Sequence, residues 1–306
     1  MNTDEKGKEV CGPEGEISHP RLWRLAMLVD GEEGRLDIVA RSMVDDGGFV
    51  CISADAGRAG SEAEMCKRIE EAVYSRPFLL GDFGKVDIVV HSRAFMPVAE
   101  GLDAEALDAA AAIAHIDGKT DADGATDAEL LHDSLTPCSL VQLWSMSGEL
   151  YNFLRRTFPT ATFHHHLSPL LRYFGLTAAK DGNFAKCHVY LHSPTGDGGS
   201  GGKADVAAFD ADKRLCLANS YSYTNVADAL FYLLSCARAC GLRPGDAKDT
   251  GRMLLWGDRS LRAALMPELG KFLAGTVPAI FPSALLSGGD KALNAPLPLT
   301  ILPLCE

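Results

Sequence analysis

The chain has 306 residues, a length that suits one large domain or two of ordinary size. Apolar residues make up 47% of it, which is normal for a globular protein with a substantial core. The formal net charge of −12 at pH 7 argues against a nucleic-acid partner and against a polybasic membrane patch, because both need clustered Lys and Arg.

The cysteines and the N-terminus predict a cytoplasmic location. Nine cysteines, an odd number, are scattered with no CxxC pair, so we expect free thiols rather than a disulfide framework. The first ten residues, MNTDEKGKEV, lack the apolar segment of a signal peptide, and no run of about 18 consecutive apolar residues is available for a membrane span. Residues 1–20 are polar and punctuated by Gly and Pro, which predicts a disordered N-terminal tail.

The first part of the chain predicts three strands, a helix and a fourth strand. A capping box indicates the start of the helix: Ser61 accepts a backbone hydrogen bond, and Glu64 reaches back to the residues before the helix. The apolar face of this helix consists of Met65, Ile69 and Val73. Apolar runs and alternation predict the strands at 22–30, 35–43, 49–54 and 86–91.

Between residues 103 and 180 the pattern predicts inserted elements and further helices. An alanine-rich helix at 103–116 precedes an acidic loop at 115–129, and two strands within 130–146 are expected to break near Pro137. Ser147 is expected to cap the next helix, and a strand at 160–165 follows it. A further helix is predicted from Ser168 as its N-cap, with Pro169 at the first helical position.

The same order of elements returns after residue 184. Strands are expected at 184–192, 203–210, 215–223 and 252–256. The helix at 225–240 lies between the last two of these strands and ends at Gly241, a C-cap residue. Its apolar stripe consists of Val226, Leu230, Leu233 and Ala237. A helix at 260–273 interrupted at Pro267, a strand at 276–281 and an extended segment at 295–306 complete the chain.

The repeated βββαβ order predicts a two-lobed α/β fold with a cleft between the lobes. This is the plan of the actin, hexokinase and Hsp70 superfamily, an actin-like (ribonuclease H-like) fold. We expect the disordered tail at 1–20, lobe I with inserted elements at 21–180 and lobe II at 181–306. If the two lobes are equivalent, Ile69 and Leu230 should be buried alike in their two helices.

Several segments resemble an uncharacterised bacterial family known only as a domain of unknown function. The resemblance covers most of residues 22–304 and is carried by FPTATFHHHLSPLL at 158–171, FD at 209–210, NSY at 219–221 and LFYLL at 230–234. That family is similar in plan to the pilus-assembly protein PilM and the division protein FtsA. The resemblance implies an actin-like ATPase fold, in which a turn of the form Asp-x-Gly followed by Ser or Thr holds phosphate in each lobe.

The turns expected to hold nucleotide depart from that pattern. The first, 30–34, has the sequence DGEEG, which lacks Ser, Thr or Lys, and its two extra carboxylates would repel a triphosphate. The second lies in the glycine-rich loop 193–203, where Asp197, Gly198 and Ser200 approximate the pattern, although a flexible insertion is the alternative interpretation. Gly257 keeps one glycine of the Gly-Gly pair that contacts adenosine in the superfamily, and Asp258 follows it.

We predict no metal site from the sequence. In the run His164, His165 and His166, adjacent strand residues point to opposite faces, so three in a row do not readily converge on one ion. We expect one of these histidines to be buried and hydrogen-bonded and another to flank the following helix. The acidic loop has Gly124 at the position of an EF-hand glycine, but Lys119 and Leu130 occupy the first and twelfth positions, so a solvated loop is favoured over a calcium loop.

These observations favour a non-enzymatic cytoplasmic scaffold or assembly protein built on a degenerate actin-like ATPase fold, a pseudo-ATPase with no cofactor and an unknown protein partner. The alternative is a divergent ATP-binding protein or ATPase that holds ATP with magnesium through Asp197, Gly198, Ser200 and Gly257. A sugar or metabolite kinase is a third hypothesis, and it would need a catalytic aspartate that the sequence does not place.

Overall fold

The computed structural model describes residues 17–44, 48–57, 59–114, 116, 128–180, 186–193, 201–242, 252–281, 292 and 295–305. The chain divides into two compact units, and each is described by itself. Unit 1 comprises Met1–Ser134, Leu140–His166 and Pro282–Thr300, and unit 2 comprises Leu135–Ser139, Leu167–Phe281 and Ile301–Glu306. The lobe boundary expected at residue 180 stays a prediction.

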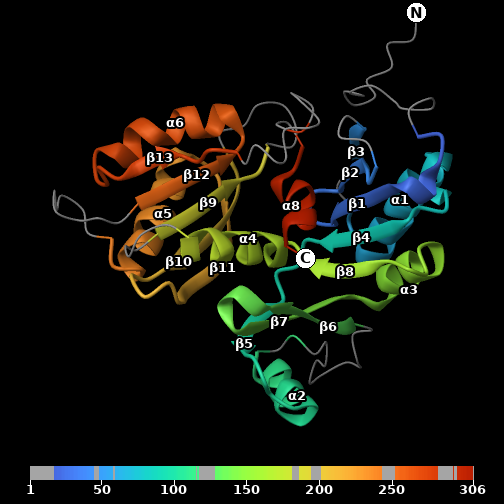
Figure 1. The fold of residues 1–306 in the computed structure, drawn as a ribbon, viewed down its shortest axis with the longest axis horizontal. Helices are drawn as coiled ribbons and strands as arrows, with labels where there is room; N and C mark the ends of the chain where they lie inside the picture. Colours follow the sequence, from blue (N-terminus) through green and yellow to red (C-terminus); the bar gives the residue numbers. More distant parts are fainter. Residues whose placement is uncertain are drawn as a thin grey trace, which may run out of the picture. The chain divides into compact units, whose positions relative to one another are not determined.

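Unit 1 is built on a five-stranded sheet with the strand order β3-β2-β1-β4-β8. Neighbouring strands are antiparallel from β1 to β3, whereas β4 and β8 run parallel to β1 (Figure 1). The bounds agree closely with the predicted strands and are β1 Trp23–Asp30, β2 Arg35–Ser42, β3 Phe49–Asp55, β4 Lys85–Val90 and β8 Thr162–His165.

Two helices, α1 (Glu62–Tyr74) and α3 (Gly148–Thr157), pack on one face of this sheet. Met65, Ile69 and Val73 of α1 are buried there, as the apolar spacing predicts. The Ser61 half of the predicted capping box is present, because its hydroxyl accepts from the N–H of Glu64 at 3.2 Å. The Glu64 carboxylate reaches back one residue further than the box requires and accepts from the N–H of Gly60 at 2.9 Å. The Ser147 hydroxyl caps α3 by accepting from the N–H of Leu150.

A smaller sheet with the order β5-β7-β6 and the helix α2 (Ala104–Ile113) form the inserted part of unit 1 (Figure 1). Its strands are β5 Phe95–Ala99, β6 Ala128–Leu135 and β7 Leu140–Ser147, and the predicted break at Pro137 is a 3₁₀ turn at Thr136–Cys138. The segment expected to be extended near the C-terminus instead forms the short helix α8 (Leu297–Thr300), which contacts β1, and a 3₁₀ turn at Leu302–Leu304. That expectation was wrong, because leucines spaced around a helical turn bury themselves here.

Unit 2 repeats the plan of unit 1 in a separate sheet with the order β11-β10-β9-β12-β13. Strands β9, β10 and β11 are antiparallel neighbours, and β12 and β13 continue parallel to β9. Both units therefore have the predicted order of three strands, a helix and a parallel strand. The bounds are β9 Lys186–Leu191, β10 Gly202–Phe209, β11 Leu215–Tyr223, β12 Arg252–Gly257 and β13 Thr276–Pro278.

Helices α5 (Val226–Ala239) and α6 (Arg259–Gly270) pack on one face of the unit 2 sheet, and α4 (Leu167–Lys180) packs on the other. From α4, the ring of Phe174 stacks on His188 of β9 with centroids 4.3 Å apart. The indole Nε1 of Trp256 donates to Nδ1 of His188 at 3.3 Å, and burial lowers the pKa of His188 to about 3. The ring of His188 is therefore neutral at pH 7 and serves as part of an aromatic core.

Three helical details differ from the sequence predictions. Helix α4 begins at Leu167, so Ser168 is its buried second residue rather than the N-cap. Helix α6 continues through Pro267, and Leu265 and Leu269, two residues to either side of it in the sequence, are both buried. The buried face of α5 consists of Ala229, Leu233, Cys236 and Ala237, whereas Val226 and Leu230 are only half-buried.

Within the ranges given above, no helix is long and apolar enough to cross a membrane.

Candidate functional site

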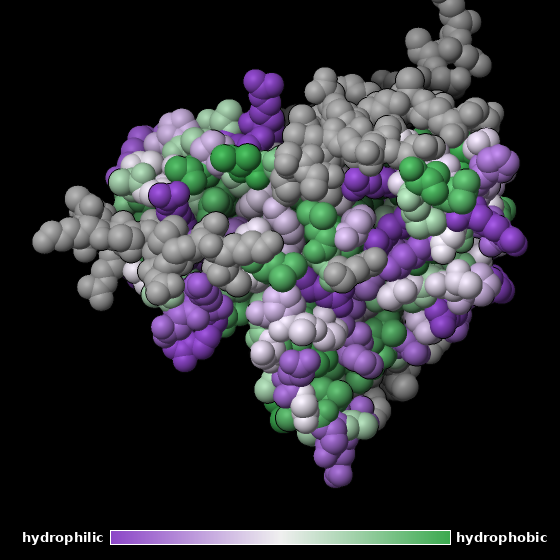
Figure 2. Space-filling view, viewed as in Figure 1, coloured by the Kyte–Doolittle hydropathy of each residue, from purple (hydrophilic) through white to green (hydrophobic). Residues whose placement is uncertain are grey.

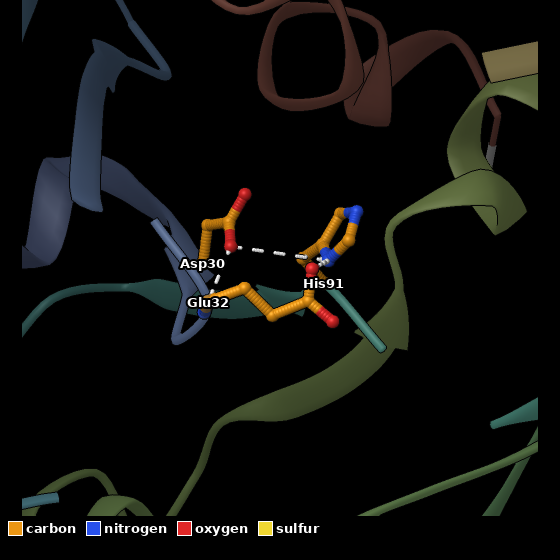
Figure 3. Close-up of side chains that lie close together, drawn as sticks. All are labelled: Asp30, Glu32 and His91. Atoms are coloured by element: carbon orange, nitrogen blue, oxygen red, sulfur yellow. Dashed lines mark hydrogen bonds and ion pairs between the residues drawn. The ribbon is translucent and has the colours of Figure 1, made fainter. Parts of the chain in front are cut away.

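The candidate site lies where two parallel strands of unit 1 end side by side (Figure 3). Asp30 is the last residue of β1, and His91 directly follows β4; the N–H of His91 donates to the carbonyl of Val29 at 2.9 Å. Glu32 lies in the turn that joins β1 to β2. In open α/β sheets, ligands bind beyond the carboxyl ends of the strands, so this edge is the place to look for chemistry.

The turn between β1 and β2 is closed by its own aspartate. The Asp30 Oδ1 atom accepts hydrogen bonds from the N–H groups of Glu32 and Glu33, each at 3.1 Å. In the superfamily pattern the backbone N–H groups of this turn face a phosphate. Here two of them already bind a carboxylate of the same turn, and Asp30 is only 7% exposed.

Three potential metal ligands meet at this edge. His91 Nδ1 lies 3.9 Å from Asp30 Oδ1 and 4.0 Å from Glu32 Oε2, and the donor atoms of the three side chains all lie within 4.8 Å of one another. The other oxygen of Glu32, Oε1, is 2.7 Å from Nε of Arg93. The ring of His91 stacks on that of His166, with centroids 4.2 Å apart and planes 28° apart.

The three consecutive histidines are all buried, and each has its own partners. His164 lies between two carboxylates: its Nδ1 is 3.1 Å from Asp133 and its Nε2 is 3.4 Å from Asp87. His165 Nε2 lies 2.9 Å from the carbonyl oxygen of Ser92. His166 stacks on His91. The expectation of a buried, hydrogen-bonded histidine is met by His164 and His165. The three rings make different contacts and do not converge on one position.

A chain of buried charges runs from Arg24 through Asp87 and His164 to Asp133. Burial alone would raise the pKa of Asp87, but the hydrogen bond from His164 and the charges of Arg24 and His164 outweigh it and hold that pKa below its ordinary value. Burial alone would lower the pKa of His164, but its hydrogen bonds to Asp133 and Asp87, with their charges, outweigh it and raise that pKa. The chain ties β1, β4 and β8 to the inserted strand β6 within unit 1.

The equivalent edge of unit 2 carries a different set of groups. Leu191 pairs with Gly257 at the ends of β9 and β12, and the N–H of Asp258 donates to the carbonyl of Leu191, as His91 does to Val29 in unit 1. His192 Nε2 lies 2.7 Å from a carboxylate oxygen of Asp205. Asp258 caps α6 by accepting from the N–H groups of Ser260 and Leu261.

Of the four residues suggested for nucleotide binding, Gly257 alone lies among the described residues. Asp197, Gly198 and Ser200 lie outside them. Gly257 has φ +87°, and a Cβ added there would lie 2.0 Å from the carbonyl oxygen of Leu191. The pairing of β12 with β9 therefore requires glycine at this position, whatever else the residue does.

The sequence analysis missed the role of His91. Its 61-residue separation from Asp30 hides the contact, which arises from the pairing of β1 with β4. One signal was available: Asp30 ends one apolar strand and His91 directly follows another, and the βββαβ pattern makes these two strands parallel neighbours. Parallel neighbours in one sheet end at the same edge.

The two repeated units define the class of this protein, which has the actin-like ATPase fold. It is similar to the crystal structure of a Bacteroides thetaiotaomicron protein with actin-like ATPase fold and unknown function. The two share a TM-score of 0.69 and 18% identity over 94% of this chain and 97% of that chain. The sequence profile of the family described as Protein of unknown function (DUF3822) matches residues 47–274, and the chain belongs to that family.

Two more distant likenesses come from secretion and pilus systems. The PilM–PilN type IV pilus biogenesis complex gives a TM-score of 0.45 and 13% identity, over 92% of this chain and 98% of that chain. The cytoplasmic domain of EpsL, an inner membrane component of the type II secretion system of Vibrio cholerae, gives 0.39 and 8%, over 90% and 96%. No curated protein matches the sequence. The family match and the Bacteroides thetaiotaomicron structure confirm the predicted resemblance to an uncharacterised family with an actin-like fold.

Proposed function

We propose that this protein is a non-enzymatic cytoplasmic scaffold or assembly protein that uses an actin-like fold to bind a protein partner and has given up ATP hydrolysis. The observation that carries the proposal is the self-closed turn after β1. A phosphate would have to displace Asp30 from the N–H groups of Glu32 and Glu33 before it could use them.

The charges around the turn add to this barrier. Asp30 and Glu32 both lie at the edge where a triphosphate would approach, and like charges at short range repel strongly in a partly buried site. Arg93 offsets part of this charge, but its Nε is engaged by Glu32. The turn is therefore better suited to a cation than to an anion.

The surface and the thiols fit the rest of the proposal. Hydrophobic groups are scattered among hydrophilic ones on the face in Figure 2, and large apolar side chains are exposed at Leu22, Met43 and Val44 of unit 1. The N–H of Met43 donates to the carbonyl of Leu22, so the backbones of these two residues are neighbours. Exposed apolar side chains that gather on a surface are typical of protein-binding sites. The described cysteines are free thiols, as expected for a reducing compartment.

The alternative is ATP binding with magnesium through Asp197, Gly198, Ser200 and Gly257. It is favoured only by the sequence pattern of the glycine-rich loop. Gly257 does not favour it, because the pairing of β12 with β9 accounts for that glycine.

Calorimetric titration with ATP and Mg²⁺, paired with thermal unfolding, separates the two functions. We expect no heat of binding and no shift in melting temperature at millimolar ATP. A true ligand at 100 times its Kd would stabilise the fold by about 2.7 kcal/mol, which a thermal scan detects easily. A shift that disappears in Asp197→Ala but persists in Asp212→Ala, a matched change in the exposed β10–β11 turn, would establish the alternative.

A further inference from the structure

We propose that the turn after β1 binds a divalent transition-metal cation, with Asp30, Glu32 and His91 as its protein ligands. The proposal goes beyond the scaffold function and does not depend on it. Where the superfamily pattern places a phosphate, this chain offers two carboxylates and an imidazole. Within the described ranges, no other set of three metal-ligating side chains brings its donor atoms so close together.

The distances are near those that one ion requires. Zinc holds nitrogen and oxygen ligands at about 2.0–2.2 Å, so two tetrahedral ligand atoms lie about 3.4 Å apart. His91 Nδ1 is 3.9 Å from Asp30 Oδ1 and 4.0 Å from Glu32 Oε2. Each of these two separations needs to shorten by roughly half an ångström, and the carboxylates of Asp30 and Glu32 lie within 4.8 Å of each other. Side-chain rotations around a bound ion can supply these changes.

Each ligand is held in place by a contact on the side away from the cluster or by the turn itself. Two N–H groups of the turn orient the carboxylate of Asp30. Arg93 binds Oε1 of Glu32 and leaves Oε2 on the side of His91. The stack on His166 fixes the plane of the His91 ring. Hydrogen-bonded carboxylates and an oriented imidazole are the usual supports of a metal site.

Burial and charge favour a cation over an empty cluster. The side chains of Asp30 and His91 are 9% and 2% exposed, whereas that of Glu32 is 36% exposed. A buried carboxylate loses hydration, and a bound cation compensates for that loss. The exposed side of Glu32 gives an ion access from solvent, and water can complete its coordination, as in zinc sites with three protein ligands.

The donor set selects the class of metal. Mg²⁺ and Ca²⁺ prefer sites made of oxygen alone, whereas imidazole nitrogen suits zinc and other first-row transition metals. One nitrogen and two carboxylate oxygens therefore favour Zn²⁺ over Mg²⁺. The proposed Zn²⁺ site is therefore distinct from a site for the Mg²⁺ that accompanies ATP.

The test is zinc binding by the full chain, purified without a polyhistidine tag and stripped with a chelator. Titration calorimetry with Zn²⁺ and metal analysis after dialysis are applied to the wild type, His91→Ala, Glu32→Gln and Glu33→Gln. Glu33→Gln is the matched control, because it removes a carboxylate from the same turn but outside the cluster. Mg²⁺ and Ca²⁺ are titrated for comparison, with no nucleotide present.

We expect one Zn²⁺ per chain in the wild type and in Glu33→Gln, with affinity at least tenfold lower in Glu32→Gln and His91→Ala. Glu32→Gln keeps the inference testable if His91→Ala fails to fold, because Glu32 is largely on the surface. Equal zinc binding by all four proteins, no zinc binding, or Mg²⁺ binding as tight as Zn²⁺ would each overturn the proposal. Failure of zinc binding would leave the scaffold function intact, because the titration with ATP and Mg²⁺ tests that function separately.

Discussion

The Nε atom of Arg24 in β1 lies 2.7 Å from Oδ2 of Asp87 in the neighbouring strand β4, and both side chains are buried. Counting back from the paired strand ends, the unit 2 sheet has Lys186 and Leu254 at the corresponding positions. An acidic residue at this position of the second strand is thus specific to unit 1. It allows His164, on the next strand, to join the same network.

The buried pair predicts a large cost when its cation is removed. Arg24→Met leaves Asp87 buried with less compensation, and breaking such a pair costs about 3–5 kcal/mol. Arg21→Met is the control: the Arg21–Asp82 pair is just as short, at 2.6 Å, but its side chains are 82% and 72% exposed, so its loss should be barely measurable. Urea denaturation of the two variants measures both costs. Similar losses of unfolding free energy would contradict the assigned burial of the network.

His164 predicts that stability falls as pH rises above about 6.5, the ordinary pKa of histidine. Folding raises the pKa of this histidine above 6.5, because the carboxylates of Asp133 and Asp87 hold its protonated form. A raised pKa contributes stability that is complete below the unfolded value and is lost as pH rises through the folded value. The groups that face the ring are Asp133 and Asp87, with Arg24 behind Asp87.

The measurement is the unfolding free energy of the wild type from pH 6 to 9. We expect it to decrease across this window, and we expect the decrease to be smaller in His164→Gln, whose side chain cannot titrate. His132→Gln, at an exposed position of β6, should keep the wild-type slope. If His164→Gln and the wild type lose stability in parallel as pH rises, the protonated histidine does not hold the network together.

The repeat was predictable because it rests on local patterns. Alternating apolar residues and capping motifs such as Ser61 mark the same five elements in each half of the chain, and the structure has them in the same sheet order. The candidate site was not predictable in this way, since Asp30 meets His91 only through the pairing of β1 with β4. Helical periodicity likewise indicated an apolar stripe on α5, but it did not show which residues beside that stripe pack against the sheet.

The structure gives a physical reason for the difference on α5. Small side chains, Ala229, Cys236 and Ala237, lie with Leu233 against the sheet, where they allow the helix to approach closely. Leu230 packs at the edge of the contact and is half-buried. Hydrophobicity alone ranks Leu230 above Ala229, so a pattern based on apolar character places the buried face about one residue away from its true position.

Gly257 and Gly241 provide the sharpest test of whether a glycine is kept for structure or for a ligand. Both have the left-handed backbone, with φ +87° and +86°. An added Cβ at Gly257 would lie 2.0 Å from the backbone oxygen of Leu191, whereas nothing lies within 4 Å of one at Gly241. The two positions thus share a conformational cost and differ in steric space.

Gly241→Ala should therefore lose only the left-handed penalty, about 1–2 kcal/mol, because alanine has room in the cap of α5. Gly257→Ala should lose that amount and several kcal/mol more, since the methyl group would force apart the paired ends of β12 and β9. Urea unfolding in the absence of any nucleotide gives both values. If Gly257→Ala is no less stable than Gly241→Ala, the sheet does not require this glycine, and its retention would instead favour a close approach by a ligand such as adenosine.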